Sequence, residues 1–156
     1  MSARIHTRLE DGGLDAAREF AAFLVEAAEG GAVVSCVGVA RPRTRNGMAI
    51  ERLFLDHHPR LTQKSLETIA VEAAARFEVS ALRVVHRCGA VAPGAGIVFV
   101  AAASAHRRAA FDAADYLMDR LKTDAVFWKR EDAVDGAHWI EPTDADRADR
   151  ARWSDA

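Results

Sequence analysis

Three segments show apolar residues at the spacing of an amphipathic helix. They are residues 15–28, which Gly30-Gly31 ends, a long segment that Pro59 opens, and residues 105–122. Apolar side chains that recur every three or four residues form one face of a helix. Ser104, directly before the third segment, has a side chain suited to capping a helix N-terminus. The pattern predicts three main helices.

Short apolar runs between these segments have the length of β-strands. The first two flank a basic turn that ends in Asn46-Gly47, so we expect them to pair as an antiparallel hairpin. Two later runs are joined by a turn with two glycines and a proline. Helices grouped between hairpins predict an α+β domain rather than a doubly wound sheet. The expected strands are residues 32–40, 49–57, 82–87, 96–103, 125–129 and 138–141.

The composition limits the class of protein. A chain of 156 residues is expected to form one domain, with a core at about residues 14–142 and a tail, residues 143–156, that is a weak helix or disordered. A net charge of -2 gives no basic field for nucleic acid. The apolar runs are too short to span a membrane, and residues 1–13 lack the apolar core of a signal peptide. We therefore expect a cytoplasmic protein that binds neither nucleic acid nor membrane.

The two cysteines are too few and too isolated for a metal cage or a disulfide framework. Cys36 lies in a valine-rich run and is expected to be a small buried residue. Cys88 lies at an expected strand end, where a reactive thiol is the alternative to a structural one. His57 and His58 are adjacent, and adjacent residues on a strand point to opposite faces, which argues against a shared metal.

Lysine is rare in this chain, which has three lysines among its 21 basic residues. Lys122 and Lys129 lie seven residues apart. Lysine offers a compact ammonium whose pKa can be lowered and an amine that can act as a nucleophile. The alternative is that Lys122 closes a helix and Lys129 lies on a solvated strand. On a strand, Lys129 and Glu131 would share a face, and burial and the acid would move the lysine pKa in opposite directions.

A second candidate site is basic. His106, Arg107 and Arg108 open the third helix, at the end where the helix dipole disfavours cations. An anion held by the first-turn amides and by arginine would resolve this conflict, whereas the alternative is that the arginines pair with acidic neighbours. Arg41 directly follows the expected strand and begins the basic turn. This turn is a similar candidate for binding an anion, and the alternative is that it forms a solvated hairpin tip.

Taken in order, these residues resemble the family of the large, catalytic subunit of molybdopterin synthase. The resemblance covers about residues 30–142, and its short motifs are specific through their order and spacing. The motifs are residues 31–41, Asp56-His57-His58-Pro59, His86-Arg87-Cys88-Gly89, Ser104-Ala105-His106-Arg107, residues 117–123 and 127–131, and Trp139-Ile140-Glu141.

The resemblance implies a fold and a reaction. The fold is an α/β hammerhead-type domain that forms a homodimer. The reaction inserts two sulfurs into cyclic pyranopterin monophosphate (precursor Z) to form the molybdopterin dithiolene. The sulfur arrives as a thiocarboxylate on the C-terminal Gly-Gly of a small ubiquitin-like subunit, and no cofactor or metal is implied on this chain.

The resemblance also implies the site residues. It places the two catalytic lysines at Lys122 and Lys129, a pocket arginine at Arg41, and an anion-binding pair at His106 and Arg107. We expect Arg41, His106 and Arg107 to converge on one concave surface that holds the substrate phosphate.

Two other functions stay open. The chain could be a non-catalytic homologue that acts as a binding module for a ubiquitin-like partner. Asp124 favours that alternative, because an acid between the lysines would weaken the positive potential of the pocket if it faced inward. The other possibility, a small-molecule acyl or phosphoryl transferase unrelated to the family, is supported only by the anion-site argument.

Overall fold

The computed structural model describes residues 2–154, which form two four-stranded sheets. The first sheet has the order β1-β4-β6-β2 and the second the order β5-β3-β7-β8. The strand pairs are antiparallel except for β1 and β4, which are parallel. The strands are β1 (Arg4–Glu10), β2 (Ala32–Val39), β3 (Ile50–His57), β4 (Ala81–Arg87), β5 (Gly89–Val91), β6 (Gly96–Ser104), β7 (Phe127–Ala133) and β8 (Gly136–Ile140).

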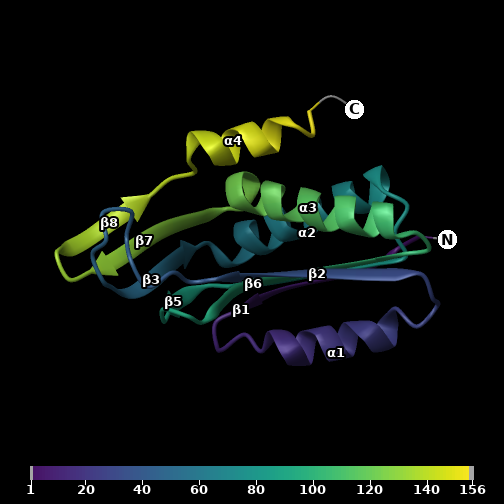
Figure 1. Cartoon of the computed structure of the whole chain (residues 1–156), viewed down its shortest axis with the longest axis horizontal. Helices are drawn as coiled ribbons and strands as arrows, with labels where there is room; N and C mark the ends of the chain where they lie inside the picture. The colour runs from purple at the N-terminus through teal and green to yellow at the C-terminus, as the bar shows by residue number, and fades with distance from the viewer. Residues whose placement is uncertain (1, 155–156) are drawn as a thin grey trace.

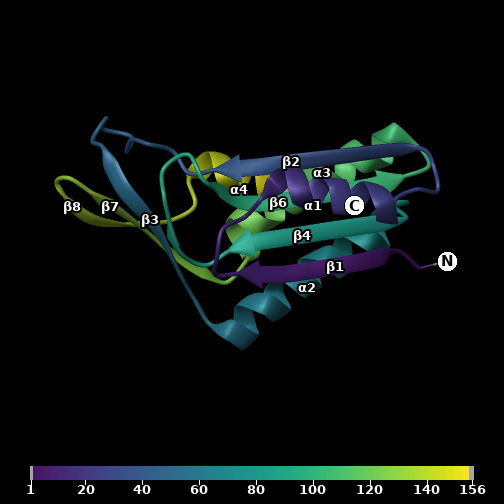
Figure 2. The same cartoon turned by 90° about the horizontal axis from the view of Figure 1, so that it is seen from below.

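The helices cover both faces of the first sheet (Figure 1). Helix α1 lies on one face, α2 and α3 lie on the other, and α4 lies over α3. The second sheet projects from one end of this layered body (Figure 2). The expected α+β class with three main helices is confirmed, and a fourth, shorter helix is added. The helices are α1 (Ala16–Glu26), α2 (Pro59–Arg76), α3 (Arg107–Asp124) and α4 (Asp144–Ala151).

The main core lies between the first sheet and helices α2 and α3. Leu66 and Ile69 of α2 pack with Val84, Val100 and Leu117, all at most 1% exposed. All seven residues of β4 are buried, because β4 is a central strand with both faces covered. Its apolar residues do not alternate, because both faces of the strand are buried, and Arg83, His86 and Arg87 are buried with them.

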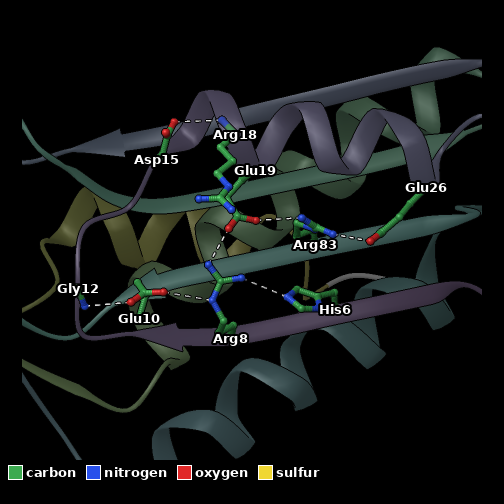
Figure 3. Close-up of polar contacts among 9 residues, drawn as sticks. All are labelled: His6, Arg8, Glu10, Gly12, Asp15, Arg18, Glu19, Glu26 and Arg83. Carbon is green, nitrogen blue, oxygen red and sulfur yellow. Dashed lines mark hydrogen bonds and ion pairs between the residues drawn. The ribbon is translucent and has the colours of Figure 1, made fainter.

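Helix α1 is joined to the sheet by ion pairs as well as by Phe23. The Arg83 side chain is 7% exposed and donates to Glu19 at 2.9 Å and to Glu26 at 2.5 Å. Glu19 also accepts from Arg8 on β1 at 2.6 Å (Figure 3). A buried arginine is tolerated only when it is paired in this way. These contacts lie on the sheet face opposite α2 and α3.

The expected hairpin between residues 32–40 and 49–57 is wrong. β2 pairs with β6 in the first sheet, whereas β3 pairs with β5 and β7 in the second. A tight turn does form at Asn46-Gly47, where Gly47 has φ +83°, but only Arg43 and Ala49 bridge across it. The two strands then diverge into different sheets, because each finds its partner elsewhere in the chain.

Three further expectations need correction. Cys36 is exposed on the edge strand β2 rather than buried. The N-cap of α3 is His106, while Ser104 ends β6, and its hydroxyl donates to the Glu78 carbonyl at 2.6 Å. Residues 4–10, to which the sequence pattern assigned no element, form β1, whose polar sequence suits an edge strand.

The segment after Pro142 is a helix, α4, with a capping box between Thr143 and Asp146. It has no buried residue, so polar and aromatic contacts hold it on α3. Arg150 donates to Asp124 at 2.9 Å, and the Trp153 indole donates to Asp119 at 2.6 Å. The Trp153 ring packs edge-on against the rings of Phe77 and Tyr116.

Between residues 2 and 154, no helix combines the length and the hydropathy that a membrane span requires.

Candidate functional site

A cavity of about 680 Å³ lies where the second sheet meets the ends of α3 and α4. Its walls come from the last turn of α3, from β7 and β8, from the first turn of α4 and from the loop after β2. Three of the five site residues expected from the sequence, Arg41, Lys122 and Lys129, line it. Its other charged or titratable lining residues are Arg45, Glu131, Asp135, His138, Glu141 and Asp146.

Lys129 is the most perturbed cation of the cavity. It lies on β7 between Leu55 of β3 and Ile140 of β8, its partners in the two adjacent strands. Cross-strand partners lie on the same face of a sheet, so two apolar side chains flank the lysine stem. The pKa of Lys129 is lowered from 10.5 to about 8. Burial is the largest cause, the Lys122 ammonium acts in the same direction, and Asp146 opposes both effects. The sequence left open whether burial or a neighbouring acid decides the pKa of Lys129, and burial has the larger effect.

Lys122 reaches the same cavity from the last turn of α3. Its neighbour Leu121 is buried in the main core, which fixes the end of the helix. Two α2 side chains then hold the connection to β7: Thr62 donates to the Val126 carbonyl at 2.6 Å, and Ser65 accepts from the Val126 amide at 3.1 Å. Both backbone polar groups of Val126, which lies between the two lysines, are thus hydrogen-bonded to α2.

Arg41 is paired with an acid inside the cavity. Its Nε donates to Glu131 at 3.1 Å, and the Glu131 side chain is 9% exposed whereas that of Arg41 is 49% exposed. Glu131 and Lys129 share a face of β7, as the alternation predicted. Arg130 points to the other face, where it lies over the rings of Phe54 and Trp139.

Asp124 does not line the cavity. Its carboxylate accepts from the guanidinium groups of Arg120 and Arg150. Burial acts to raise the Asp124 pKa, but the hydrogen bonds from Arg150 and Arg120 lower it overall. The acid between the two lysines is therefore used to attach α4 to α3, and it does not oppose the lysines within the pocket.

The floor of the cavity is neutral. Phe127 lines it and stacks on His86, with ring centroids 4.1 Å apart. Burial lowers the pKa of His86 to about 3, so its ring is uncharged near neutral pH. Its Nδ1 lies 2.8 Å from the Arg87 carbonyl, which can only accept, so Nδ1 carries the proton. Nearby Cys88 is buried, and burial raises its thiol pKa, which favours the structural reading over a reactive thiol.

His106 and Arg107 lie at the opposite end of α3 from the cavity. Lys122 lies 15 positions after Arg107, so at a rise of 1.5 Å per residue the two are about 22 Å apart along the helix. Figure 1 shows α3 beginning at the end of the body remote from the second sheet. The expected convergence of Arg41, His106 and Arg107 is therefore wrong within one chain, because a straight helix separates them.

Among the residues that the structure describes, the positive charge at the start of α3 nevertheless has no acidic partner. Its first turn contains no acidic residue, and the N-cap His106 makes no side-chain capping bond. Within residues 2–154, neither Arg107 nor Arg108 forms an ion pair. The alternative in which these arginines pair with acidic neighbours is not observed.

Comparison with known proteins assigns the family. A family model described as MoaE protein matches residues 10–124. The chain belongs to the MoaE family. The molybdopterin synthase catalytic subunit of Pseudomonas aeruginosa is 42% identical over 148 residues, which cover 95% of this chain and 98% of that protein. The protein of the same name from Caulobacter vibrioides is 47% identical over 132 residues, or 85% of this chain and 86% of that one.

Solved structures agree with this MoaE assignment. The molybdopterin biosynthesis MoaE protein from Burkholderia ambifaria superposes with a TM-score of 0.77 at 36% sequence identity. The superposition covers 99% of both chains, including the N-terminal strand and the C-terminal helix.

Sequence reasoning missed two parts of the site. Asp146 enters the cavity from α4, a segment whose sequence contains few apolar residues and predicts a weak helix or disorder. The pattern Thr143-x-x-Asp146 was a readable sign of a helix start, because it matches a capping box. Thr62 and Ser65 carried no signal, since their role depends on how α2 packs on the connection before β7.

We predict that replacing Lys129 by Met stabilises the folded protein at pH 7. The substitution keeps an unbranched stem and removes an ammonium that burial disfavours. The difference between a pKa of 10.5 and one of about 8 corresponds to at most on the order of 3 kcal/mol. A lysine whose folded pKa is lowered destabilises the fold fully below pH 8, and this penalty disappears as the pH rises from about 8 to 10.5.

Urea unfolding at fixed protein concentration and several pH values measures this effect. The parent should gain stability relative to Lys129→Met as the pH rises through that window. Lys64→Met, at an exposed lysine of α2, is the matched control and should follow the parent. A Lys129→Met protein that is less stable than the parent at pH 7 would contradict the assigned desolvation.

Proposed function

We propose that this chain is the catalytic subunit of a molybdopterin synthase. It transfers sulfur from the thiocarboxylated C-terminus of a small ubiquitin-like subunit to cyclic pyranopterin monophosphate, and two such transfers form the dithiolene. The observation that carries the proposal is a single cavity with two lysines, one of which has its pKa lowered to about 8. The relatives named as catalytic subunits support it.

The cavity has the charges that the thiocarboxylate requires. A thiocarboxylate becomes a carboxylate when it gives up its sulfur, so an anion must be held both before and after the transfer. Lys122 is exposed at the end of a rigid helix and offers an ammonium to the incoming tail. Preorganised cations of this kind stabilise negative charge that develops during a reaction.

Lys129 is suited to proton transfer. A general acid or base works best when its pKa lies near the operating pH, and a value of about 8 meets that condition. We therefore assign binding of the tail to Lys122 and proton transfer at the pterin to Lys129. Arg41, held by Glu131, provides a further cation at the same wall.

The substrate phosphate needs a separate anion site, and we assign it to His106 and Arg107. These residues combine a helix N-terminus with an unpaired guanidinium. Because α3 holds them about 22 Å from Lys122, they can serve the cavity only if a second copy of the chain supplies them. A homodimer with each pocket completed by its neighbour meets this requirement.

Exposed apolar side chains support self-association. Val37 and Val39 lie on β2, an edge strand of the first sheet, and Trp128 and Trp139 lie on β7 and β8; all four are exposed. Unpaired edges and exposed apolar patches are common at interfaces between subunits. We propose a homodimer with one small subunit docked at each distal end.

The alternative of a non-catalytic binding module loses its main support. It rested on Asp124 weakening the pocket, and Asp124 is paired with Arg120 and Arg150 outside the cavity. A module that only docks a partner has no need of a desolvated lysine in the pocket.

We predict that Lys122→Ala and Lys129→Ala each lower molybdopterin formation by roughly 10²-fold or more, the usual scale for a positioned acid–base or electrostatic group. Both variants should fold and still bind the small subunit through surface contacts. The measurement is product formed from precursor Z and the thiocarboxylated small subunit. Lys64→Ala is the matched control and should be nearly silent. Equal, mild effects at all three lysines would refute the proposed function.

The homodimer predicts that light scattering of the purified chain gives twice the chain mass. A strict monomer at micromolar concentration would contradict the assembly.

The homodimer also predicts complementation between two inactive variants. Arg107→Ala should weaken precursor binding more than folding. When Arg107→Ala and Lys129→Ala chains are mixed and allowed to exchange, half of the dimers are mixed, and each has one complete pocket. Activity should return to about a quarter of the parental value, whereas no recovery would show that Arg107 serves its own chain or none.

A further inference from the structure

Asp146 is a carboxylate of the cavity wall to which the proposed chemistry gives no role. It lies in the first turn of α4 and lines the cavity together with Lys122 and Lys129. Within residues 2–154 neither Asp146 nor Glu141 forms an ion pair, whereas Glu131 is paired with Arg41 and Asp135 with His138. Of the two unpaired acids, Asp146 is the one whose charge acts on Lys129. Its charge is therefore not neutralised by a neighbouring guanidinium.

Contacts at both ends of α4 fix the position of the Asp146 carboxylate. Locally, it accepts from the Thr143 amide at 2.8 Å, while its own amide donates to the Thr143 hydroxyl at 3.1 Å. At the far end, Arg152 donates to Asp119 at 2.6 Å, and Trp153 packs against the rings of Phe77 and Tyr116. A helix without buried residues is thus held against α3 by polar and aromatic contacts, and its first turn closes one wall of the cavity.

We propose that Asp146 is a positioning residue for the lysine pair: α4 holds its carboxylate in the cavity as the counter-charge that keeps Lys129 in its ammonium form before an anionic substrate enters. The role follows from the crowding of cations, because two ammoniums in a partly desolvated cavity favour loss of a proton. A lysine that has lost its proton cannot donate one to the pterin. This inference rests on the proposed function for its consequence in catalysis, but not for the protonation of Lys129 itself.

The direction of the electrostatic effects agrees. Asp146 raises the Lys129 pKa against burial and against Lys122. In return, burial acts to raise the Asp146 pKa, but the Thr143 hydrogen bonds and the charges of Lys122 and Lys129 lower it, so the carboxylate stays ionised near neutral pH.

Other charged or titratable groups also surround Lys129, from every element packed against it. His86, beneath Phe127, is neutral. Lys122 acts more strongly on Lys129 than Asp146 does and in the opposite direction, and the remaining groups of the cavity wall are either paired or act less on Lys129 than Asp146 does. The other groups of the wall are Lys122 on α3, Arg41 and Arg45 after β2, Glu131 on β7, Asp135 before β8, His138 on β8, and Glu141 after β8.

The test is a nuclear magnetic resonance titration of the lysine side chains in isotope-labelled protein. Only three lysines contribute signals, and single replacements assign them. Asp146→Asn should move the Lys129 midpoint below the parental value of about 8. Asp144→Asn is the matched control, since Asp144 lies in the same turn but outside the cavity, and it should leave the midpoint unchanged.

A second pair of variants separates charge from structure. Asp146→Glu keeps the charge and is compatible with a capping box, so it should keep the Lys129 midpoint near the parental value, whereas Asp146→Gln, of the same size, should lower it. If one of these variants fails to fold, Asp146→Asn and its control Asp144→Asn still test the proposal. An unchanged midpoint in the neutral variants, or equal midpoints for Glu and Gln, would overturn the proposal.

The titration uses neither partner nor substrate, so its result does not depend on whether the chain is a molybdopterin synthase. In the synthase assay, the pH profile of product formation should shift to lower pH in Asp146→Asn and should stay in place in Asp144→Asn. A profile that does not move while the Lys129 midpoint does would count against proton transfer by Lys129 and would leave the counter-charge role of Asp146 intact.

Discussion

The desolvation of one ammonium determines what this cavity can do. Lys129 lies on a central strand of the second sheet, between Leu55 and Ile140, where water cannot fully solvate its charge. The second sheet is needed for this arrangement, because one apolar neighbour comes from β3, far away in the sequence, and the other from β8, the strand that follows β7. A lysine on an isolated strand would keep its ordinary pKa and offer no acid or base near neutral pH.

The remaining parts of the fold arrange other charges around this lysine. Helix α3 brings Lys122 to one side, and its end is fixed by Leu121 in the core and by the bonds from Thr62 and Ser65 to Val126. Helix α4 brings Asp146 to another side, although it buries no residue of its own. The same helix thus explains Asp124, whose pairing with Arg150 joins α4 to α3 rather than opposing the lysines.

Local features of the fold could be predicted from the sequence, and long-range pairings could not. The periodicity of residues 59–77 and 105–122 identified α2 and α3, and strand alternation placed Lys129 and Glu131 on one face. The partners of β2 and β3 were wrong because pairing depends on contacts far apart in sequence, and the short turn at Asn46-Gly47 suggested a neighbour instead. Similarly, motif order identified Arg41, His106 and Arg107 but could not show that α3 keeps Arg107 away from Lys122.

The pH dependence of a single turnover of sulfur transfer tests the proposed role of Lys129 most directly. With the precursor and the thiocarboxylated small subunit both below saturation, the rate reports the free protein and should show a transition near pH 8, the pKa of Lys129. Replacing Lys122 by Ala removes a like charge, so the residual rate of that variant should show the same transition at higher pH. A rate that does not change between about pH 7 and pH 9, in a protein that still forms product, would contradict the role of a desolvated Lys129 in the reaction.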